Sequence, residues 1–356
     1  MPLRRRNVLF GLFGLSLPFI SSSCTQNSPQ ASNSGSTANS TVSPSSEAKN
    51  SEPAPAKIRV GYQVYAGAEI LAKGLGLAKE TFANTDVEYL RFDSGRDVNT
   101  AFAANSIDFG VLGSAAAAVG LSRNIPYDVF YVYELTNTAE ALVVKDNIKT
   151  IADIKGKKIA TTFSSTSHYS LLSLLELEKI NQSEVTILDM LPQDSLAAWQ
   201  RGNIDGAYTW EPVLATLEQG GGKVLVTSGE LAKRGHATLN VAVVSQSFAR
   251  QYPNVVKQYV AMLDKAVNVY RQDPQAAAKA LSAELGVPPE EALRQAGSLS
   301  WFDASEQVDN QNLGTADKPG DIAKTLQQTA DFMVTQKAIP SAPNQDTVQK
   351  HIYHAL

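Results

Sequence analysis

Residues 158–179 read KIATTFSSTSHYSLLSLLELEK, and they contain one full unit of the pattern from which the fold can be predicted. The first part of this stretch, Lys158–Thr162, is typical of a short buried strand, and the run from Tyr169 to Lys179 is typical of a helix. Between them lies a turn rich in Ser and Thr, which are the residues that begin helices. A strand, a polar turn and a helix in succession are the repeating unit of an open α/β sheet.

The same alternation extends in both directions along the chain. A first α/β set occupies residues 58–144 and a second occupies 151–244, and after Ser245 only helical runs follow. The expected strands are 58–62, 87–92, 108–112, 128–134, 141–144, 158–162, 184–189, 206–209, 223–226 and 239–244. The expected helices are 68–79, 96–104, 114–121, 169–179, 196–201, 255–271, 274–285, 290–296 and 322–336. Two α/β sets and a helical tail predict two lobes, with the tail packed on the first.

The first 24 residues predict an export signal. Arg4–Arg6 form a cationic start, Val8–Ile20 is an apolar run too short to span a bilayer, and Cys24 follows small residues. The pattern resembles a bacterial lipobox, except that Ser21 stands where Leu is usual. We therefore expect Cys24 to be lipidated, with ordinary cleavage nearby as the alternative. The pair Arg5-Arg6 leaves twin-arginine export open.

Residues 25–56 consist almost entirely of Ser, Asn, Thr, Ala, Pro, Gln and Glu. Such a segment buries too little apolar surface to offset its ordering entropy, so we expect a disordered tether. The chain has one cysteine, which excludes an intrachain disulfide, and its net charge of −4 argues against nucleic acid as the partner. We find no Walker motif, no G-x-S-x-G turn and no His/Cys cluster with metal spacing, so we expect no metal, no cofactor and no catalysis.

Several segments, in order, resemble the periplasmic taurine-binding proteins within the wider nitrate, sulfonate and thiamine-precursor group. They are 60–63 (VGYQ), 92–95 (FDSG), 112–114 (LGS), 140–145 (EALVVK), 165–172 (STSHYSLL), 198–208 (AWQRGNIDGAY), Trp210, Pro212 and 238–239 (TL). The resemblance spans residues 57–340 and implies a type II periplasmic-binding-protein fold, with two α/β lobes joined by two crossover strands. The crossovers would be Ala141–Lys145 and Val241–Gln246. Lobe 1 would then comprise 57–144 and 245–356, and lobe 2 would comprise 145–244.

A sulfonate stays ionised, so its site needs hydrogen-bond donors, and helix N-termini supply them. Ser114 is expected to cap one helix, and Ser165, Thr166 and Ser167 precede another; both turns face the ligand crevice of an open α/β sheet. These hydroxyls can bind an anion, or they can cap the helices without binding anything. Gln63, at the end of the first strand, is either a further donor or a solvated side chain.

The amine of a taurine-like ligand calls for carboxylates and an aromatic face. The resemblance places Glu140 at an acidic position of the family, and Trp210 can provide a cation–π wall or simply pack in the core. Glu211 is either a second carboxylate or a surface acid. At position 240 the family carries Asp, whereas this chain has Asn240, which has no charge. Glu211 is our candidate replacement; otherwise the ligand lacks an amine.

Two further side chains near these segments have open roles. His168 belongs to the matching stretch and is either structural or a ligand contact. Arg96 begins a helix and could touch an anion.

The resemblance implies an extracytoplasmic substrate-binding component of an ABC importer that captures taurine or a related small sulfonate by closing its lobes. The partners would be a permease and its ATPase, and the protein would be a lipid-anchored monomer on the periplasmic side of the membrane. The alternatives are a binding protein for an alkylsulfonate, nitrate or another small anion, a sensory lobe pair, and an enzyme of the thiamine-pyrimidine type.

Overall fold

The computed structural model describes residues 54–356. The predictions for the signal peptide, for Cys24 and for residues 25–53 lie outside the described residues. The last residues of the predicted tether belong to the fold instead. The Thr85 hydroxyl donates to the Pro55 carbonyl at 2.9 Å, and the Asp86 amide donates to the Ala56 carbonyl at 3.1 Å.

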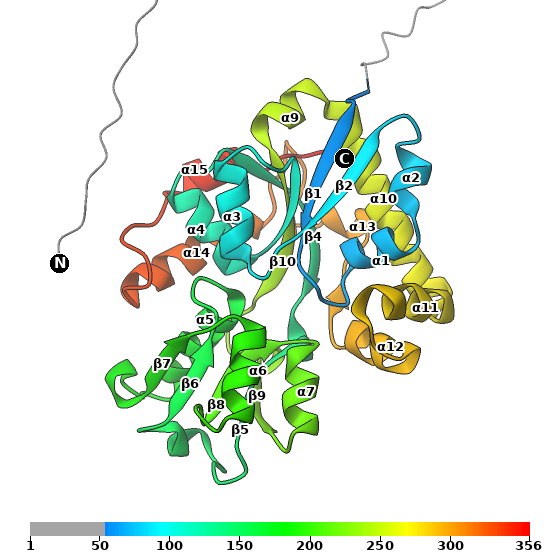
Figure 1. Ribbon diagram of the computed structural model, residues 1–356. Helices are drawn as coiled ribbons and strands as arrows, with labels where there is room; N and C mark the ends of the chain where they lie inside the picture. Colours follow the sequence, from blue (N-terminus) through cyan, green and yellow to red (C-terminus); the bar gives the residue numbers. More distant parts are fainter. Residues whose placement is uncertain (1–53) are drawn as a thin grey trace, which may run out of the picture. The chain divides into compact units, whose positions relative to one another are not determined.

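Two mixed sheets form two lobes (Figure 1). The strands of the first sheet, in spatial order, are β11 (Ser300–Trp301), β4 (Tyr127–Leu135), β10 (Leu239–Ser245), β3 (Phe109–Gly113), β1 (Lys57–Tyr62) and β2 (Asp86–Arg91). Those of the second sheet are β7 (Thr186–Asp189), β6 (Lys158–Thr161), β8 (Gly206–Trp210), β5 (Glu140–Val144) and β9 (Lys223–Thr227). The predicted α/β architecture with two lobes is confirmed.

The two sheets share one topology. In the first, β1 pairs in parallel with β2 and β3, and β10 runs antiparallel between β3 and β4. In the second, β6 pairs in parallel with β7 and β8, and β5 runs antiparallel between β8 and β9. Each antiparallel strand is the one by which the chain arrives from the other lobe.

This pairing moves the lobe boundaries from their predicted places. β5 belongs entirely to the second sheet and β10 entirely to the first, so the chain passes between the lobes before each strand, at residues 136–139 and 233–238. The predicted boundaries after residues 144 and 244 lie one strand too late. The hydrophobic pattern identified the strands but could not show which sheet each one joins. We call 57–135 with 239–356 the first lobe, and 140–232 the second lobe.

Helices cover both faces of each sheet. In the first lobe they are α1 (Ala68–Gly74), α2 (Leu77–Thr81), α3 (Gly95–Ala103), α4 (Ser114–Ser122), α9 (Gln246–Gln251), α10 (Pro253–Gln272), α11 (Pro274–Leu285), α12 (Pro289–Gly297), α13 (Ala304–Gln307), α14 (Ile322–Thr335) and α15 (Gln345–Lys350). In the second lobe they are α5 (Thr166–Leu177), α6 (Pro192–Gln200), α7 (Val213–Gln219) and α8 (Ser228–Ala232). The 3₁₀ turns found within residues 54–356 are η1 (Asn137–Ala139), η2 (Ile151–Ile154) and η3 (Gln182–Glu184).

Some predicted helices differ in their limits. The helix expected over 68–79 is divided into α1 and α2, because Gly76 adopts a left-handed conformation with φ of 72°. Helix α5 begins at Thr166, three residues earlier than expected, since Ser165 caps it by accepting a hydrogen bond from the His168 amide.

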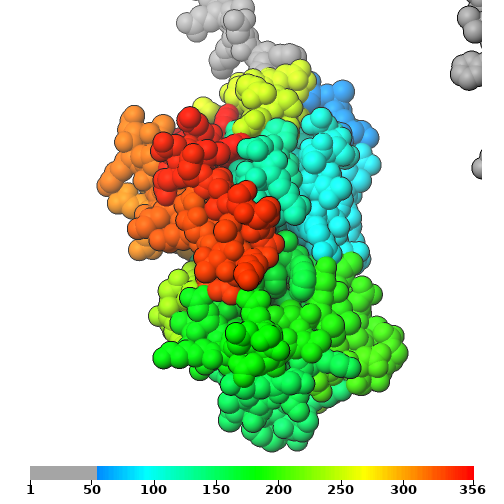
Figure 2. Space-filling view, turned by 90° about the vertical axis from the view of Figure 1, so that its left-hand side faces the viewer, coloured from blue at the N-terminus to red at the C-terminus, as the bar shows by residue number. Residues whose placement is uncertain are grey.

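The side chains of β10 alternate between two hydrophobic clusters, so both faces of the first sheet are buried. The helical tail packs on this lobe as predicted, and Figure 2 shows the orange and red segment covering one side of it and reaching the second lobe. At that junction Tyr169 of α5 contacts Phe332 of α14, with ring centroids 5.0 Å apart. Within residues 54–356 we find no helix with the length and apolar character needed to cross a membrane.

Candidate functional site

A pocket lies between the lobes, at the carboxyl ends of the parallel strands, where open α/β sheets bind ligands. The space among its lining residues is about 610 Å³, open solvent at its mouth included. Sixteen residues line it: Gln63, Tyr65, Ala66, Gly95, Gly113, Ala116, Thr136, Ala139, Glu140, Ser165, Thr166, Trp210, Glu211, Asn240, Gln295 and Leu299. None of these described residues is Lys or Arg, so a bound anion must be met by neutral donors.

Three helices begin at this pocket. Gly95 is the first residue of α3, Gly113 directly precedes α4, and Thr166 is the first residue of α5. The starts of α4 and α5 belong to opposite lobes and are in close contact, because a Cβ on Gly113 would stand 2.8 Å from Thr166 Cγ2. First-turn amides lack intrahelical acceptors and carry partial positive charge, so this junction is suited to an anion.

The hydroxyls predicted to bind the anion are engaged elsewhere. Thr166 and Ser167 donate to Glu140 Oε2 at 2.5 and 2.8 Å, and Ser165 donates to the Thr162 carbonyl at 2.6 Å. Thr166 and Ser165 line the pocket, whereas Ser167 is fully buried and does not. Each hydroxyl has a single proton, and here it donates that proton to another group of the protein, so it has none left to donate to an anion.

Ser114 also differs from its predicted place. The residue that caps α4 is Gly113, and Ser114 is the first residue inside the helix. Its side chain is fully buried, does not line the pocket, and accepts a 3.4 Å hydrogen bond from the Leu239 amide. The backbone of this turn, and not its hydroxyl, therefore faces the pocket.

Gln63 and Trp210 do line the pocket. Gln63 donates one amide proton to the Val111 carbonyl at 3.1 Å, which leaves its second proton for another acceptor. Trp210 is half-buried and packs against the first lobe's core while presenting a face to the pocket.

His168 and Arg96 are not among the lining residues. The His168 ring stacks on Phe163 with centroids 4.5 Å apart, and burial lowers its pKa to about 4. The Arg96 guanidinium crosses between the lobes to Asp189 at 2.8 Å.

Glu140 lies in a cage of hydroxyl groups. In addition to Thr166 and Ser167, Ser228 donates to its Oε1 at 2.7 Å, and the Ser170 hydroxyl lies 3.3 Å from the same oxygen. Burial raises the pKa of Glu140, and these hydroxyl donors oppose the rise. The four hydroxyls fill the carboxylate's acceptor positions, although Glu140 still lines the pocket.

Glu211 faces the pocket from the second lobe and is bonded to the first. Its Oε1 accepts from Arg294 Nη2 of α12 at 2.7 Å, and its Oε2 accepts from the Ala215 amide at 2.9 Å. Burial raises the pKa of Glu211, and Arg294 counteracts this effect. The alternative of a solvated surface acid is wrong, because the side chain is only 3% exposed.

Asn240 lines the pocket beside a buried carboxyl that the sequence did not single out. Asn240 Nδ2 donates to Glu134 Oε1 at 2.9 Å, and Tyr65 donates its hydroxyl proton to the same oxygen at 2.8 Å. Glu134 is fully buried, and burial raises its pKa to about 7. Asn240 therefore faces the pocket with an acidic group directly behind it.

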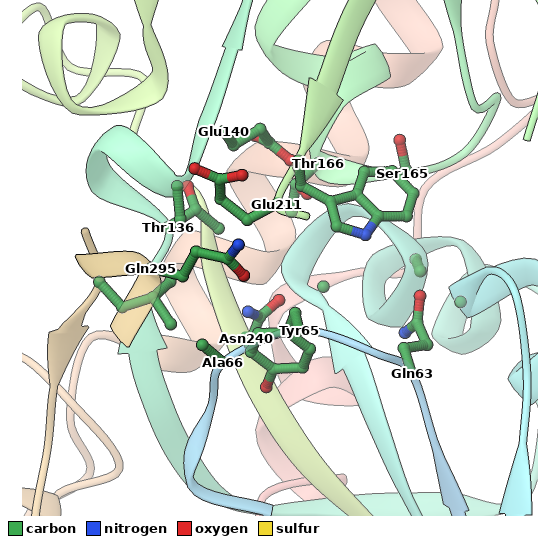
Figure 3. Close-up of a pocket in the computed structure, with 16 residues that line it drawn as sticks. Gln63, Tyr65, Ala66, Thr136, Glu140, Ser165, Thr166, Glu211, Asn240 and Gln295 are labelled. Atoms are coloured by element: carbon green, nitrogen blue, oxygen red, sulfur yellow. The ribbon is translucent and has the colours of Figure 1, made fainter. Parts of the chain in front are cut away.

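The pocket has two different ends (Figure 3). In this view Gln63 and Ser165 lie on one side, and Thr136, Glu211 and Gln295 lie on the other. Gln295 donates to Glu291 at 2.8 Å, while its buried Oε1 has no hydrogen-bond partner among residues 54–356. The sequence does not single out Tyr65, Thr136 or Gln295, because they come from loops and from a helix of the tail with no local signal for a site.

No group of three or more His, Cys, Asp or Glu side chains that could hold a metal ion occurs in the described part of the chain. Near the C-terminus, His351 Nδ1 lies 3.3 Å from Asp128 Oδ1.

Two α/β lobes of one topology, with a pocket between them at the helix N-termini, define the class of two-lobed periplasmic-binding folds. The chain belongs to the NMT1/THI5-like family, whose pattern matches residues 71–277, more than half of its length. It is 35% identical over 294 residues to the taurine-binding periplasmic protein of Escherichia coli K12, covering 81% of this chain and 89% of that protein. It is 26% identical over 304 residues to a putative aliphatic sulfonates-binding protein of the same organism, covering 84% and 90%.

The fold is also that of a solved structure. The alkanesulfonate-binding protein SsuA from Xanthomonas axonopodis pv. citri, bound to MOPS, superposes with a TM-score of 0.71 at 24% identity and covers 85% of this chain and 99% of that one. This likeness confirms the predicted periplasmic-binding fold.

Proposed function

We propose that this chain captures a small organosulfonate, with taurine as the first candidate, for uptake by an ABC importer. The observation that carries the proposal is the meeting of α4 and α5 from opposite lobes at Gly113 and Thr166, over a pocket whose described lining contains no Lys or Arg. First-turn amides and helix dipoles stabilise a permanent anion without needing a titrating base. A sulfonate between the two helix starts would hold the lobes together, which is how a capture protein closes.

The opposite end of the pocket suits an amine. At that end Gln295 Oε1 is a buried acceptor without a partner in residues 54–356. Asn240 pairs with Gly113 in the sheet and so lies closer to the helix starts; it uses Nδ2 for Glu134, so that its Oδ1 remains to accept. In Figure 3 the Gln295 amide lies between the Glu211 carboxylate and Asn240. An unpaired buried acceptor destabilises a protein by about 1–3 kcal/mol, and a ligand ammonium would supply the missing donors. An alkylsulfonate would leave Gln295 unpaired, and nitrate is too small to reach both ends.

Capture without chemistry is the reading that the relatives support, since both are named as binding proteins. The protein would act as a monomer and pass its ligand to a permease driven by an ATPase. The leader at residues 1–24 supports an extracytoplasmic location, with Cys24 as the lipid-carrying residue and the polar segment after it as a tether.

The test is calorimetric titration of the purified protein, carrying Cys24→Ser so that no lipid is attached. The ligands are taurine, ethanesulfonate, nitrate and sulfate. We expect one-to-one binding of taurine, weaker binding of ethanesulfonate, and still weaker binding of the inorganic anions. Binding of ethanesulfonate alone would keep sulfonate capture and exclude taurine, whereas tighter binding of nitrate or sulfate would overturn the proposal. Mass spectrometry of the released ligand must show it unchanged, because conversion would favour the enzyme alternative.

A further inference from the structure

Glu134 has an unusual set of contacts for a buried carboxyl group. Both of its donors, Tyr65 and Asn240, line the pocket, and both bond to Oε1, at 2.8 and 2.9 Å. Its Oε2 is buried and has no hydrogen-bond partner in the described part of the chain. Buried polar atoms are nearly always paired, so an unpaired carboxyl oxygen behind a binding site calls for an explanation.

The contact with Glu134 fixes which end of Asn240 meets the ligand. A carboxyl oxygen that already takes the tyrosine proton requires Nδ2 of Asn240, and not Oδ1, on its side. Asn240 Oδ1 is thereby turned toward Gly113, where a Cβ would stand 3.6 Å from it. Asn240 therefore offers the pocket an acceptor oxygen, Oδ1, that carries no charge. The negative charge beside it is on Glu134, to which Asn240 Nδ2 is bonded.

The other two carboxyl groups of the site are occupied. Glu140 has hydroxyl groups around both of its oxygens, and Glu211 is paired with Arg294 and with a backbone amide. Glu134 is therefore the carboxyl group beside the pocket that has neither a cationic partner nor a full set of donors within residues 54–356. A cation bound at Asn240 would compensate it.

We propose that Glu134 is the specificity-determining positioning residue for the cationic end of the ligand. Glu134 holds Asn240 Oδ1 toward the ligand ammonium and supplies the negative charge that Asn240 lacks. The two residues together thus replace a single carboxylate, with the acceptor oxygen on Asn240 and the charge on Glu134. This inference rests on the proposed capture of a sulfonate and specifies its class as an aminosulfonate.

The experiment compares taurine with ethanesulfonate, which has the same sulfonate and no amine, by calorimetry on the wild-type protein and on Glu134→Gln. We expect Glu134→Gln to weaken taurine binding by about tenfold or more and to change ethanesulfonate binding by less than about threefold. Glu69→Gln is the matched control, because Glu69 is equally buried in the same lobe but is bonded to Tyr133 and Tyr259 instead of to pocket residues. It should leave both affinities unchanged.

A charge exchange separates this role from a structural one. The double variant Glu134→Gln with Asn240→Asp returns one negative charge to the pair and reverses the polarity of its hydrogen bond. We expect it to regain most of the taurine preference.

Each outcome of these titrations decides a different claim. Equal losses for both ligands in Glu134→Gln, or no recovery in a folded double variant, would overturn the role of Glu134 and leave sulfonate capture standing. A wild-type protein that prefers ethanesulfonate would also overturn it. A wild-type protein that binds neither sulfonate would overturn the proposed function together with this inference.

Discussion

The Glu211 carboxylate accepts a hydrogen bond from the Arg294 guanidinium at 2.7 Å, and this contact joins the second lobe to the first beside the pocket. The two partners differ in environment, since the Glu211 side chain is 3% exposed and that of Arg294 is 47% exposed. A buried carboxylate therefore depends on a cation delivered by the opposite lobe. When the lobes separate, Glu211 loses this cation, so the ion pair favours the closed arrangement.

We expect Arg294→Gln to weaken the binding of taurine and ethanesulfonate by similar factors, about tenfold each. The reason is that, without the Arg294 guanidinium, closing the lobes no longer gives the Glu211 carboxylate a cationic partner. The groups at the two ends of the ligand site are not changed. Calorimetry gives the two affinities, and small-angle scattering of the ligand-bound protein should show a larger radius of gyration. A loss confined to taurine would contradict this assignment, because it would place Arg294 at the amine end only.

The control is a second ion pair between the lobes. Arg96 bonds Asp189 at 2.8 Å, but both side chains are well exposed, at 39% and 37%. Exposed pairs contribute about 0.2–1 kcal/mol, so Arg96→Gln should change either affinity by only a few-fold.

The fold could be predicted because its strands and helices follow from short-range patterns in the sequence. Strand alternation, the Ser165 cap and the polar turns are all short-range features, and each led to an element that the structure contains. The site could be predicted only in part. Gln63 and Trp210 lie at the carboxyl ends of parallel strands, which an open sheet brings to one edge, and Glu140 and Asn240 lie at the starts of the antiparallel strands beside them.

The remaining site residues depend on contacts between distant segments. Glu134 matters through Asn240, which is 106 residues away, and Arg294 matters through Glu211, which is 83 residues away. Nothing in the sequence around Glu134 distinguishes it from an ordinary strand residue. The same limit explains why Thr166 and Ser167, predicted as ligand donors, bond to Glu140 instead.

Gly113→Ala should block closure without harming the lobes. The backbone at Gly113 has φ of −67°, which alanine adopts freely, but the new methyl group would stand 2.8 Å from Thr166 of the other lobe. We expect weaker binding of every ligand, by about tenfold, with an unchanged melting temperature. Gly297→Ala is the control, since its Cβ would meet only Tyr270 Oη, at 3.8 Å. A large fall in melting temperature for Gly113→Ala alone would instead indicate damage within the lobe.

Cys24→Ser tests the proposed anchor. If Cys24 carries lipid, the wild-type protein should incorporate labelled palmitate and partition into the detergent phase, and the variant should do neither. Taurine affinity should be the same for both proteins, because Cys24 lies outside the residues that form the pocket. Equal partitioning of the two proteins would exclude lipidation at this cysteine.

The affinity for taurine should rise with pH in a way that depends on Glu134. Burial raises the pKa of Glu134 to about 7, so in the empty protein the carboxyl group is mostly protonated at pH 6. A ligand ammonium favours the ionised form, so binding below pH 7 releases a proton. Taurine affinity should therefore increase by up to about tenfold per pH unit below pH 7 and level off above it.

Two controls identify the group that titrates. Ethanesulfonate has no ammonium, so its affinity in the wild-type protein should change little over the same range, and Glu134→Gln should remove the slope for taurine. Glu140 and Glu211 also line the pocket and have raised pKa values, so a slope that persists in Glu134→Gln would assign the proton to one of them.

The buried Glu69, whose pKa is raised to about 7 as well, contributes only to stability. Because its folded pKa lies above its unfolded one, it makes the unfolding free energy fall as pH rises toward 7. Glu69→Gln should lessen that fall and leave the slope for taurine unchanged.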